Sequence, residues 1–264
     1  MGWNDAYGYL CGVAGKHGMT GAADAPRVDD GLPLGARIGS LVRIQQAPLL
    51  RASADGSLIA LPEEADVRIV AVSQIRLNLG GSLYRYYLAT GDRDEQEKFL
   101  QLYRNAQGVV TEILFCTQLT RLIPETAEDQ DAYMGTAGAG LGDRSYTLSR
   151  SQLAAGGLDD ADARLVFGAQ DGLDYWRDAG DPEISFVPPY SGSEIRLDDA
   201  SGQHGLRQEI YFMPYQRRLR GGGSEFLLIT TAILSSVNGD RSRRGIHVDF
   251  VIGIPLEQER LVIQ

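Results

Sequence analysis

The sequence predicts a mainly β protein: a β-rich α+β fold with two antiparallel β-meander halves and few short helices. Three observations carry this prediction. Short apolar runs recur along most of the chain, turn residues such as Gly, Asp and Asn separate most of them, and no stretch sustains a 3.6-residue apolar period. Short strands joined by tight turns are typical of antiparallel sheets.

The composition is that of a globular protein, with 264 residues of which 43% are apolar and 23% charged. A formal net charge of −10 disfavours non-specific binding to nucleic acid. Cys11 and Cys116 lie far apart, so a disulfide framework is not indicated. The apolar runs are too short to span a membrane and the N-terminus lacks signal-peptide features, so we expect a cytoplasmic protein.

The first half of the chain begins with a segment of different character. Residues 1–31 are rich in Gly, Ala and Asp without an apolar period, which predicts a flexible leader that is dispensable for folding. Residues 32–124 form the first β-rich half. Its predicted strands are 38–45, 57–61, 67–77, 83–89, 98–104 and 109–117.

Residues 125–142 interrupt this rhythm. A short helix is predicted at 126–134 with Thr126 as its N-cap, followed by a Gly-rich loop at 135–142. A dinucleotide-binding loop needs a buried strand before it and a helix after it. Neither is predicted here, so the segment is interpreted as a connector.

Residues 143–264 form the second β-rich half, which ends in a three-stranded meander. Tyr175 and Trp176 are expected to pack an acidic, turn-rich loop onto the sheet. The turn at 220–224 and the Asn238-Gly239 turn provide positions that tolerate positive φ. The predicted strands are 145–148, 164–167, 183–187, 194–197, 206–218, 225–235 and 245–255.

The two halves share one spacing. Tyr84 precedes Phe99 by fifteen positions, and Tyr211 precedes Phe226 by fifteen positions. An internal duplication would explain this spacing, and so would a chance alignment of two meanders with aromatic and aliphatic alternation. Both explanations stay open.

Residues that could carry chemistry are sparse. His247 lies in a predicted strand, on the same face as Asp249, and such a pair could orient an imidazole for acid–base work. The favoured interpretation is a solvent-side pair on a half-exposed sheet, because no nucleophile or metal-ligand spacing accompanies it. Glu209, His247 and Asp249 form the alternative polar site. No catalytic residue, metal or cofactor is predicted.

Arginines gather at the two turns that flank the predicted strand 225–235. Because a strand rises about 3.3 Å per residue, roughly 35 Å separates the two groups. Arg241, Arg243 and Arg244, in the longer turn, are the candidate site for an acidic protein partner or a peripheral contact with anionic lipid. Protection of the sheet edge is the alternative role.

A family resemblance is carried by six runs: 34–42 (LGARIGSLV), 98–102 (KFLQL), 110–115 (VTEILF), 209–217 (EIYFMPYQR), 225–229 (EFLLI) and 248–256 (VDFVIGIPL). They resemble the YjfK-like family of bacterial proteins of unknown function, although Pro214 and the leader depart from its pattern. The resemblance implies an accessory protein in an envelope-stress context and carries no catalytic residue over. We therefore expect a non-enzymatic accessory or scaffold protein that binds a protein partner. The alternative is a small-ligand-binding protein or enzyme with a site between the two β halves.

Overall fold

The computed structural model describes residues 29–89, 97–155, 160–198, 205–237 and 245–264. The described part is mainly β, which confirms the predicted fold class. None of the described helices is both long and apolar enough to cross a membrane. The strands are β1 (Leu41–Ile44), β2 (Asp66–Leu77), β3 (Gly81–Leu88), β4 (Lys98–Asn105), β5 (Val110–Leu122), β6 (Ser145–Ser149), β7 (Gly172–Arg177), β8 (Tyr190–Leu197), β9 (Gly205–Arg218), β10 (Ser224–Val237), β11 (Ile246–Pro255) and β12 (Leu261–Ile263).

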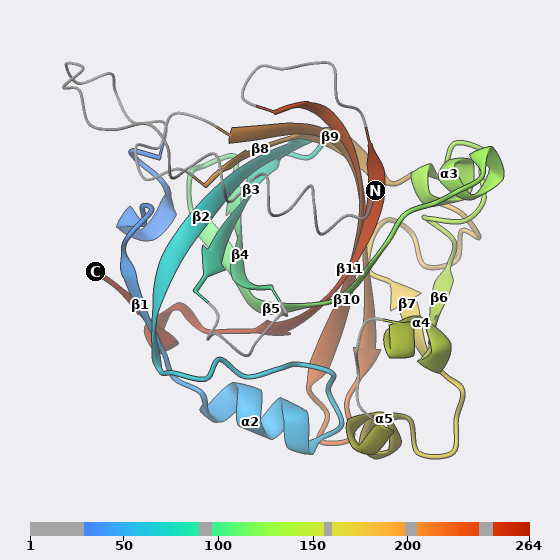
Figure 1. Cartoon of the computed structure of the whole chain (residues 1–264), viewed down its shortest axis with the longest axis horizontal. Helices are drawn as coiled ribbons and strands as arrows, with labels where there is room; N and C mark the ends of the chain where they lie inside the picture. Colours follow the sequence, from blue (N-terminus) through green and yellow to red (C-terminus); the bar gives the residue numbers. More distant parts are fainter. Residues whose placement is uncertain (1–28, 90–96, 156–159, 199–204, 238–244) are drawn as a thin grey trace.

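Eight of these strands close into an antiparallel barrel. Their order around the ring is β2-β3-β4-β5-β11-β10-β9-β8, and β8 pairs with β2 to complete it. Figure 1 shows this ring in projection, with the helices outside it. β1 and β12 extend the sheet from β2, and β7 and β6 extend it from β9. The helices are α2 (Ala47–Ala54), α3 (Ala127–Met134), α4 (Arg150–Ala155) and α5 (Asp160–Phe167), with short 3-10 turns η1 (Pro33–Gly35) and η2 (Gln258–Arg260).

Two apolar cores lie on the two faces of the barrel wall. Period-two alternation sends successive side chains of each strand to opposite faces. One core holds, among the described residues, only members of the barrel strands and the adjoining Leu79, with none from the helices or the outer strands, so it lies inside the barrel. Its buried and partly buried members include Ala71, Ile75, Tyr87, Phe99, Leu114, Val251, Leu228, Ile210 and Tyr190. The larger core lies outside the wall, under α2, β1, β6 and α4, and includes Leu49, Val42, Leu148, Leu153, Tyr86 and Phe250.

The two β-rich halves share this one barrel. Each half contributes four consecutive barrel strands, and both seams, β5–β11 and β2–β8, join the halves. The spacing noted in the sequence does not give matching pairs: Phe99 pairs with Tyr87, whereas Phe226 pairs with Gln216, two positions beyond the equivalent residue. The strand order therefore repeats while the register does not, and duplication stays a prediction.

Three segments predicted as strands adopt other structures. Residues 164–167 end helix α5, where Ala163 and Phe167 are buried one turn apart. Residues 57–61 form no strand and bond to side chains of other elements, such as Thr117, which accepts from Ala60 N at 3.2 Å. Residues 183–187 wrap around Arg177, whose guanidinium donates to the carbonyls of Ile184 and Ser185. In both loops side chains take most of the place of a neighbouring strand, and the 183–187 loop keeps only an isolated backbone bridge between Phe186 and Asp143.

The predicted helix at 126–134 is confirmed as α3. Thr126 Oγ1 accepts a hydrogen bond from Asp129 N at 3.0 Å, which is the expected N-cap contact. The helix ends at Gly135, whose φ of 64° suits glycine because it lacks a Cβ. Most of the predicted leader lies outside the described residues. Asp29 is buried and its Oδ2 accepts from Ile38 N at 3.0 Å, so the packed structure includes the end of that segment.

Pro214 occupies a place in β9 where no ladder donor is required. β8 pairs with β9 only as far as Phe212, and β7 joins the same edge at Tyr215. Pro214 falls in the gap between these two partners, and its carbonyl accepts from Asp178 N at 2.9 Å. A proline in an inner strand is therefore tolerated because its missing N–H faces a break in the pairing.

Candidate functional site

A polar cluster lines the lumen at one end of the barrel. Most of these side chains come from strands whose connections at this end (90–96, 199–204 and 238–244) lie outside the described residues, whereas Arg121 comes from β5, which leads into the described residues 123–126. Most of them are buried, in contrast with the apolar lumenal core next to them. We call them the lumenal cluster: Arg85, Tyr87, Glu97, Gln101, Arg121, Glu194, Arg196, Gln208, Thr230, His247 and Asp249.

An ion pair across the β5–β11 seam forms one side of the cluster. Arg121 Nε and Nη2 donate to the two carboxylate oxygens of Asp249 at 2.5 and 2.8 Å. Leu119 is an extra, unpaired residue on β5, because Val251 pairs with Gln118 and Phe250 with Thr120. This bulge reverses the alternation and turns Arg121 inward. Burial would raise the pKa of Asp249, but Arg121 outweighs it and holds that pKa below its usual range.

His247 stands beside this ion pair. Its Nε2 lies 3.6 Å from Asp249 Oδ2, and the residues are only 8% and 9% exposed. The favoured interpretation of a solvent-side pair is therefore wrong, because barrel closure places this face of β11 in the lumen. Glu209 does not join them: it is exposed on the outer face of β9, where Tyr211 Oη donates to it at 3.1 Å.

A second ion pair lies near the β2–β8 seam. Arg196 Nη2 donates to Glu97 Oε1 at 2.6 Å, and its guanidinium carbon lies 3.8 Å above the Tyr87 ring. This stacking places a planar cation on an aromatic face. Burial, assisted by the negative charge of Glu194, raises the pKa of Tyr87 to about 12, so its hydroxyl stays protonated.

Arg85 and Glu194 are both buried, but they do not form a direct ion pair. Among the described residues, Arg85 Nε donates to Gln101 at 3.0 Å and Nη2 to Thr230 at 3.1 Å, and neither acceptor is charged. Glu194 accepts from Tyr87 and from a second residue, both at the long distance of 3.4 Å. Burial would lower the pKa of Arg85, while nearby groups including Glu194 raise it on balance. The two charges thus interact without touching.

Gln208 carries an acceptor without a donor. Its Nε2 donates to Glu194 at 3.4 Å, and its Oε1 has no hydrogen-bond partner among the described residues. The residue is 7% exposed, so bulk water does not readily satisfy this oxygen. A buried acceptor left unpaired costs about 1–3 kcal/mol. Such a group therefore marks a place where a donor is expected.

A different polar cluster lies outside the barrel wall. Glu225 is fully buried, and its Oε1 accepts from Tyr175 Oη at 2.7 Å and from Arg217 Nε at 2.6 Å. Its Oε2 accepts from Ser57 Oγ and from Leu58 N, the latter at 2.8 Å. We call these five residues the Glu225 cluster. All four bonds are made within the chain, so the cluster fastens the 57–61 segment, β7 and β9 to β10.

Tyr175 and Trp176 therefore have other roles than expected. The prediction that both pack a loop onto the sheet is wrong, because they belong to strand β7. Alternation buries Tyr175 against Glu225 and leaves Trp176 55% exposed on the other face.

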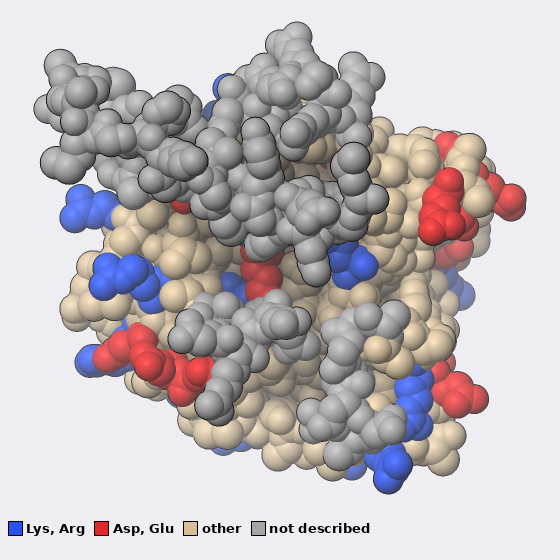
Figure 2. Space-filling view, viewed as in Figure 1, with Lys and Arg blue, Asp and Glu red and all other residues tan. Residues whose placement is uncertain are grey.

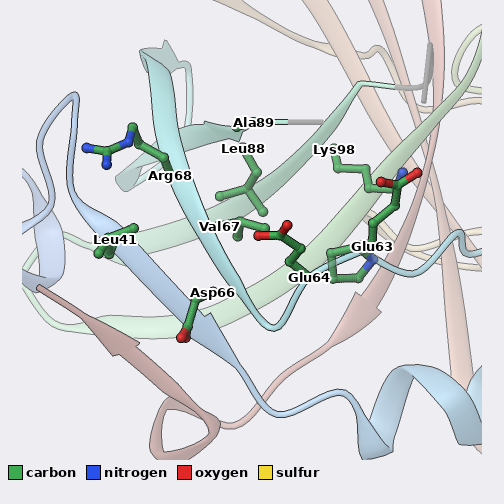
Figure 3. A pocket seen from close by; sticks show the side chains of 10 residues that line it. Leu41, Glu63, Glu64, Asp66, Val67, Arg68, Leu88, Ala89 and Lys98 are labelled. Carbon is green, nitrogen blue, oxygen red and sulfur yellow. The ribbon is translucent and has the colours of Figure 1, made fainter. Parts of the chain in front are cut away.

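A pocket of about 310 Å³ lies on the outer face of the first half (Figure 3). Val67, Leu88 and Lys98 contribute its strand side, and the exposed Glu63 and Glu64 its rim. Burial lowers the pKa of Lys98, opposed by the negative charge of Glu63, toward which it points in Figure 3. All of the lining residues belong to the first half, so this pocket is not a site between the halves.

Sequence reasoning missed the residues that matter most in the lumen. His247 and Asp249 were candidates, whereas Arg85, Glu194 and Gln208 were not. One signal was present: in β3 both faces are apolar, with Leu83 and Tyr87 on one face, yet Arg85 stands between them. A strand that is apolar on both faces is buried on both, so its single charge must also be buried. Arg241, Arg243 and Arg244 lie outside the described residues.

Comparisons with family models, with curated proteins and with solved structures find no match to this chain. The YjfK-like resemblance therefore stays an expectation from the sequence. Any function proposed for the chain depends on the geometry of its own residues.

Proposed function

We propose that this chain is a binding protein that takes a small polar ligand into the polar end of its barrel. The observation that carries the proposal is the unpartnered Oε1 of Gln208, buried beside Glu194 and on the same lumenal wall as Arg85. Apo proteins satisfy most of their buried polar groups internally. A ligand that donates a hydrogen bond to this oxygen would offset the free-energy cost of leaving it buried and unpaired.

The position of the cluster supports one of the two function classes left open by the sequence. Both barrel seams join the first half to the second, and Arg121–Asp249 lies across one of them. The lumen is therefore the space between the β halves, where the small-ligand alternative places its site. A barrel mouth is a common place for such a site.

The chemistry supports binding in preference to catalysis. Cys116 is the one cysteine among the described residues, and burial raises the pKa of its thiol far above the usual range. A protonated thiol is a poor nucleophile. Asp249 is already paired with Arg121, so it is a weak base toward His247. These groups are better suited to holding a ligand than to transforming one.

A thermal-shift screen of the full chain tests this function. The panel contains amino acids, carboxylates, amines, sugars and nucleosides, each at millimolar concentration. We expect one class to raise the melting temperature by several degrees through preferential binding to the folded state. Gln208→Met should abolish the shift, and Glu209→Gln, one residue away on the outer face, should retain it. A shift that survives in Gln208→Met, or no shift with any class, would overturn the proposal.

The cellular setting remains part of the proposal. The net charge of −10 supports the absence of nucleic-acid partners. A cytoplasmic location stays a prediction of the sequence. Figure 2 shows basic and acidic side chains interspersed on the visible face, rather than one basic patch. An acidic protein partner or a membrane surface docking at Arg241, Arg243 and Arg244 stays a prediction of the sequence.

A further inference from the structure

The described lumenal cluster holds equal numbers of cationic and anionic side chains, apart from His247. Three arginines face three carboxylates. Two of the arginines are paired directly, Arg121 with Asp249 and Arg196 with Glu97. The remaining charges are Arg85 and Glu194, which are 4% and 3% exposed and not in contact.

The guanidinium of Arg85 can donate further hydrogen bonds. A guanidinium has five N–H donors. Among the described residues, Arg85 uses one on Gln101 and one on Thr230, and the Tyr87 hydroxyl is a further hydrogen-bonding neighbour of the guanidinium, so not all five donors are used. The acceptors it has are neutral, so its charge is not directly compensated. An anionic group is the partner that a buried guanidinium binds most strongly, because such hydrogen bonds are charge-assisted.

The side-chain oxygens of Glu194 and Gln208 can accept further hydrogen bonds. Glu194 Oε1 and Oε2 each accept one hydrogen bond at 3.4 Å, longer than a charged acceptor normally makes. Gln208 Oε1 accepts none. Together they form an acceptor pair on neighbouring strands β8 and β9, where Glu194 and Gln208 are directly opposite each other. An ammonium group has three donors and no acceptor, which matches this pair.

We propose that the ligand of the lumen is a zwitterion, with an anionic carboxylate held by Arg85 and an ammonium held by Glu194 and Gln208. This inference rests on the proposed function and names its ligand class. A zwitterion adds no net charge to a cluster whose own charges balance. A simple anion would leave Glu194 unpaired, and a simple amine would leave Arg85 unpaired, and an unpaired buried charge opposes binding.

Matched ligands test the inference by isothermal titration calorimetry. The probes are ω-amino acids from glycine to 6-aminohexanoate, each with the carboxylate and the amine of the same chain length. We expect one chain length to bind at least about tenfold more tightly than both of its matched compounds, since a charge-assisted hydrogen bond contributes about that factor or more. The preferred length reports the separation of the two charged groups.

Three variants identify the residues. Glu194→Gln keeps the shape of the side chain and should weaken zwitterion binding at least about tenfold, because the ammonium loses its counter-charge. Arg85→Lys keeps the positive charge but loses the planar set of N–H donors. It should therefore lower the affinity for the matched carboxylate as well as for the zwitterion. Glu209→Gln, on the outer face, should leave all affinities unchanged. Circular dichroism and the melting temperature of each variant show whether its barrel is folded.

The outcomes separate this inference from the proposed function. Equal binding of the zwitterion and its matched carboxylate would overturn the zwitterion assignment, as would unchanged affinity in folded Glu194→Gln. A sugar or nucleoside that binds wild type but not Gln208→Met would overturn it too, while the proposed function would stand. If no probe in the series and no compound in the screen binds, both fall.

Discussion

The two buried polar clusters of this protein lie on opposite faces of the same barrel wall and differ in how completely they are bonded. In the Glu225 cluster, both carboxylate oxygens accept two hydrogen bonds from the chain itself. In the lumenal cluster, Gln208 Oε1 accepts none and Arg85 has no charged contact among the described residues. A complete network stabilises a fold, whereas an incomplete one leaves binding capacity for another molecule. Substitutions in each cluster should therefore have opposite consequences.

The largest effect is expected for Glu225→Ala. Four donors lose their acceptor in a site that is fully buried, and Arg217 is left with an uncompensated charge. Breaking a buried pair in this way costs about 3–5 kcal/mol of unfolding free energy. Urea denaturation checks this, with exposed Glu209→Ala as the control, for which a change within about 0.5 kcal/mol is expected. If Glu225→Ala lowers the free energy of unfolding by less than about 1 kcal/mol, the Glu225 cluster does not stabilise the fold as described.

Asp249→Asn should destabilise the protein by about 3 kcal/mol near neutral pH, the lower end for a buried pair because Arg121 keeps partial exposure. The effect should depend on pH. The folded-state pKa of Asp249 lies below its ordinary value, so its stabilising contribution is complete above about pH 4 and is lost as pH falls toward the folded pKa.

Urea unfolding of wild type and Asp249→Asn between pH 3 and 7 measures this difference. The gap between the two proteins should be constant from pH 5 to 7 and should narrow as the buffer is acidified. A gap that widens at acidic pH would reverse the assigned sign, and a gap that does not change would remove the Arg121–Asp249 pair as its source.

Gln208→Met should change the unfolding free energy of the apo protein by less than about 1 kcal/mol. Its Nε2 loses one long hydrogen bond to Glu194, while the cost of burying an unpaired oxygen disappears. The same substitution should abolish ligand binding. Denaturation and titration of one preparation test both halves of this prediction. A loss of stability as large as that of Glu225→Ala would mean that the lumenal cluster is as structural as the outer one.

The smallest effect on stability is expected for the Arg241→Ser, Arg243→Ser, Arg244→Ser triple variant. The sequence predicts these charges on a turn, so unfolding free energy should change by no more than about 0.5 kcal/mol. If they contact an anionic surface, flotation with phosphatidylserine-containing vesicles should fall in the variant, most clearly at low salt. Equal flotation of both proteins would leave protection of the sheet edge as their role.

The local structures that the sequence predicted correctly depend on neighbouring residues. The meander β9–β10–β11 and the N-cap of α3 by Thr126 follow from alternation, turn residues and a single side-chain contact. The errors involve distant partners. Residues 183–187 form no strand because Arg177 binds their carbonyls, and α5 is too short for its buried Ala163 and Phe167 to reveal a helical period.

The sequence by itself determined which side chains of a strand share a face, because alternation is a property of the extended backbone. It placed His247 and Asp249 together in this way. Which face of each strand turns inward was decided only by tertiary structure, since closure requires β2 and β8 to pair although they lie far apart in the chain. That closure converted a pair expected at the surface into part of a lumen, and it brought Arg85, Glu194 and Gln208 to the same wall. No local sequence pattern predicts that these three residues lie close together, because the contacts that bring them there join strands far apart in the chain.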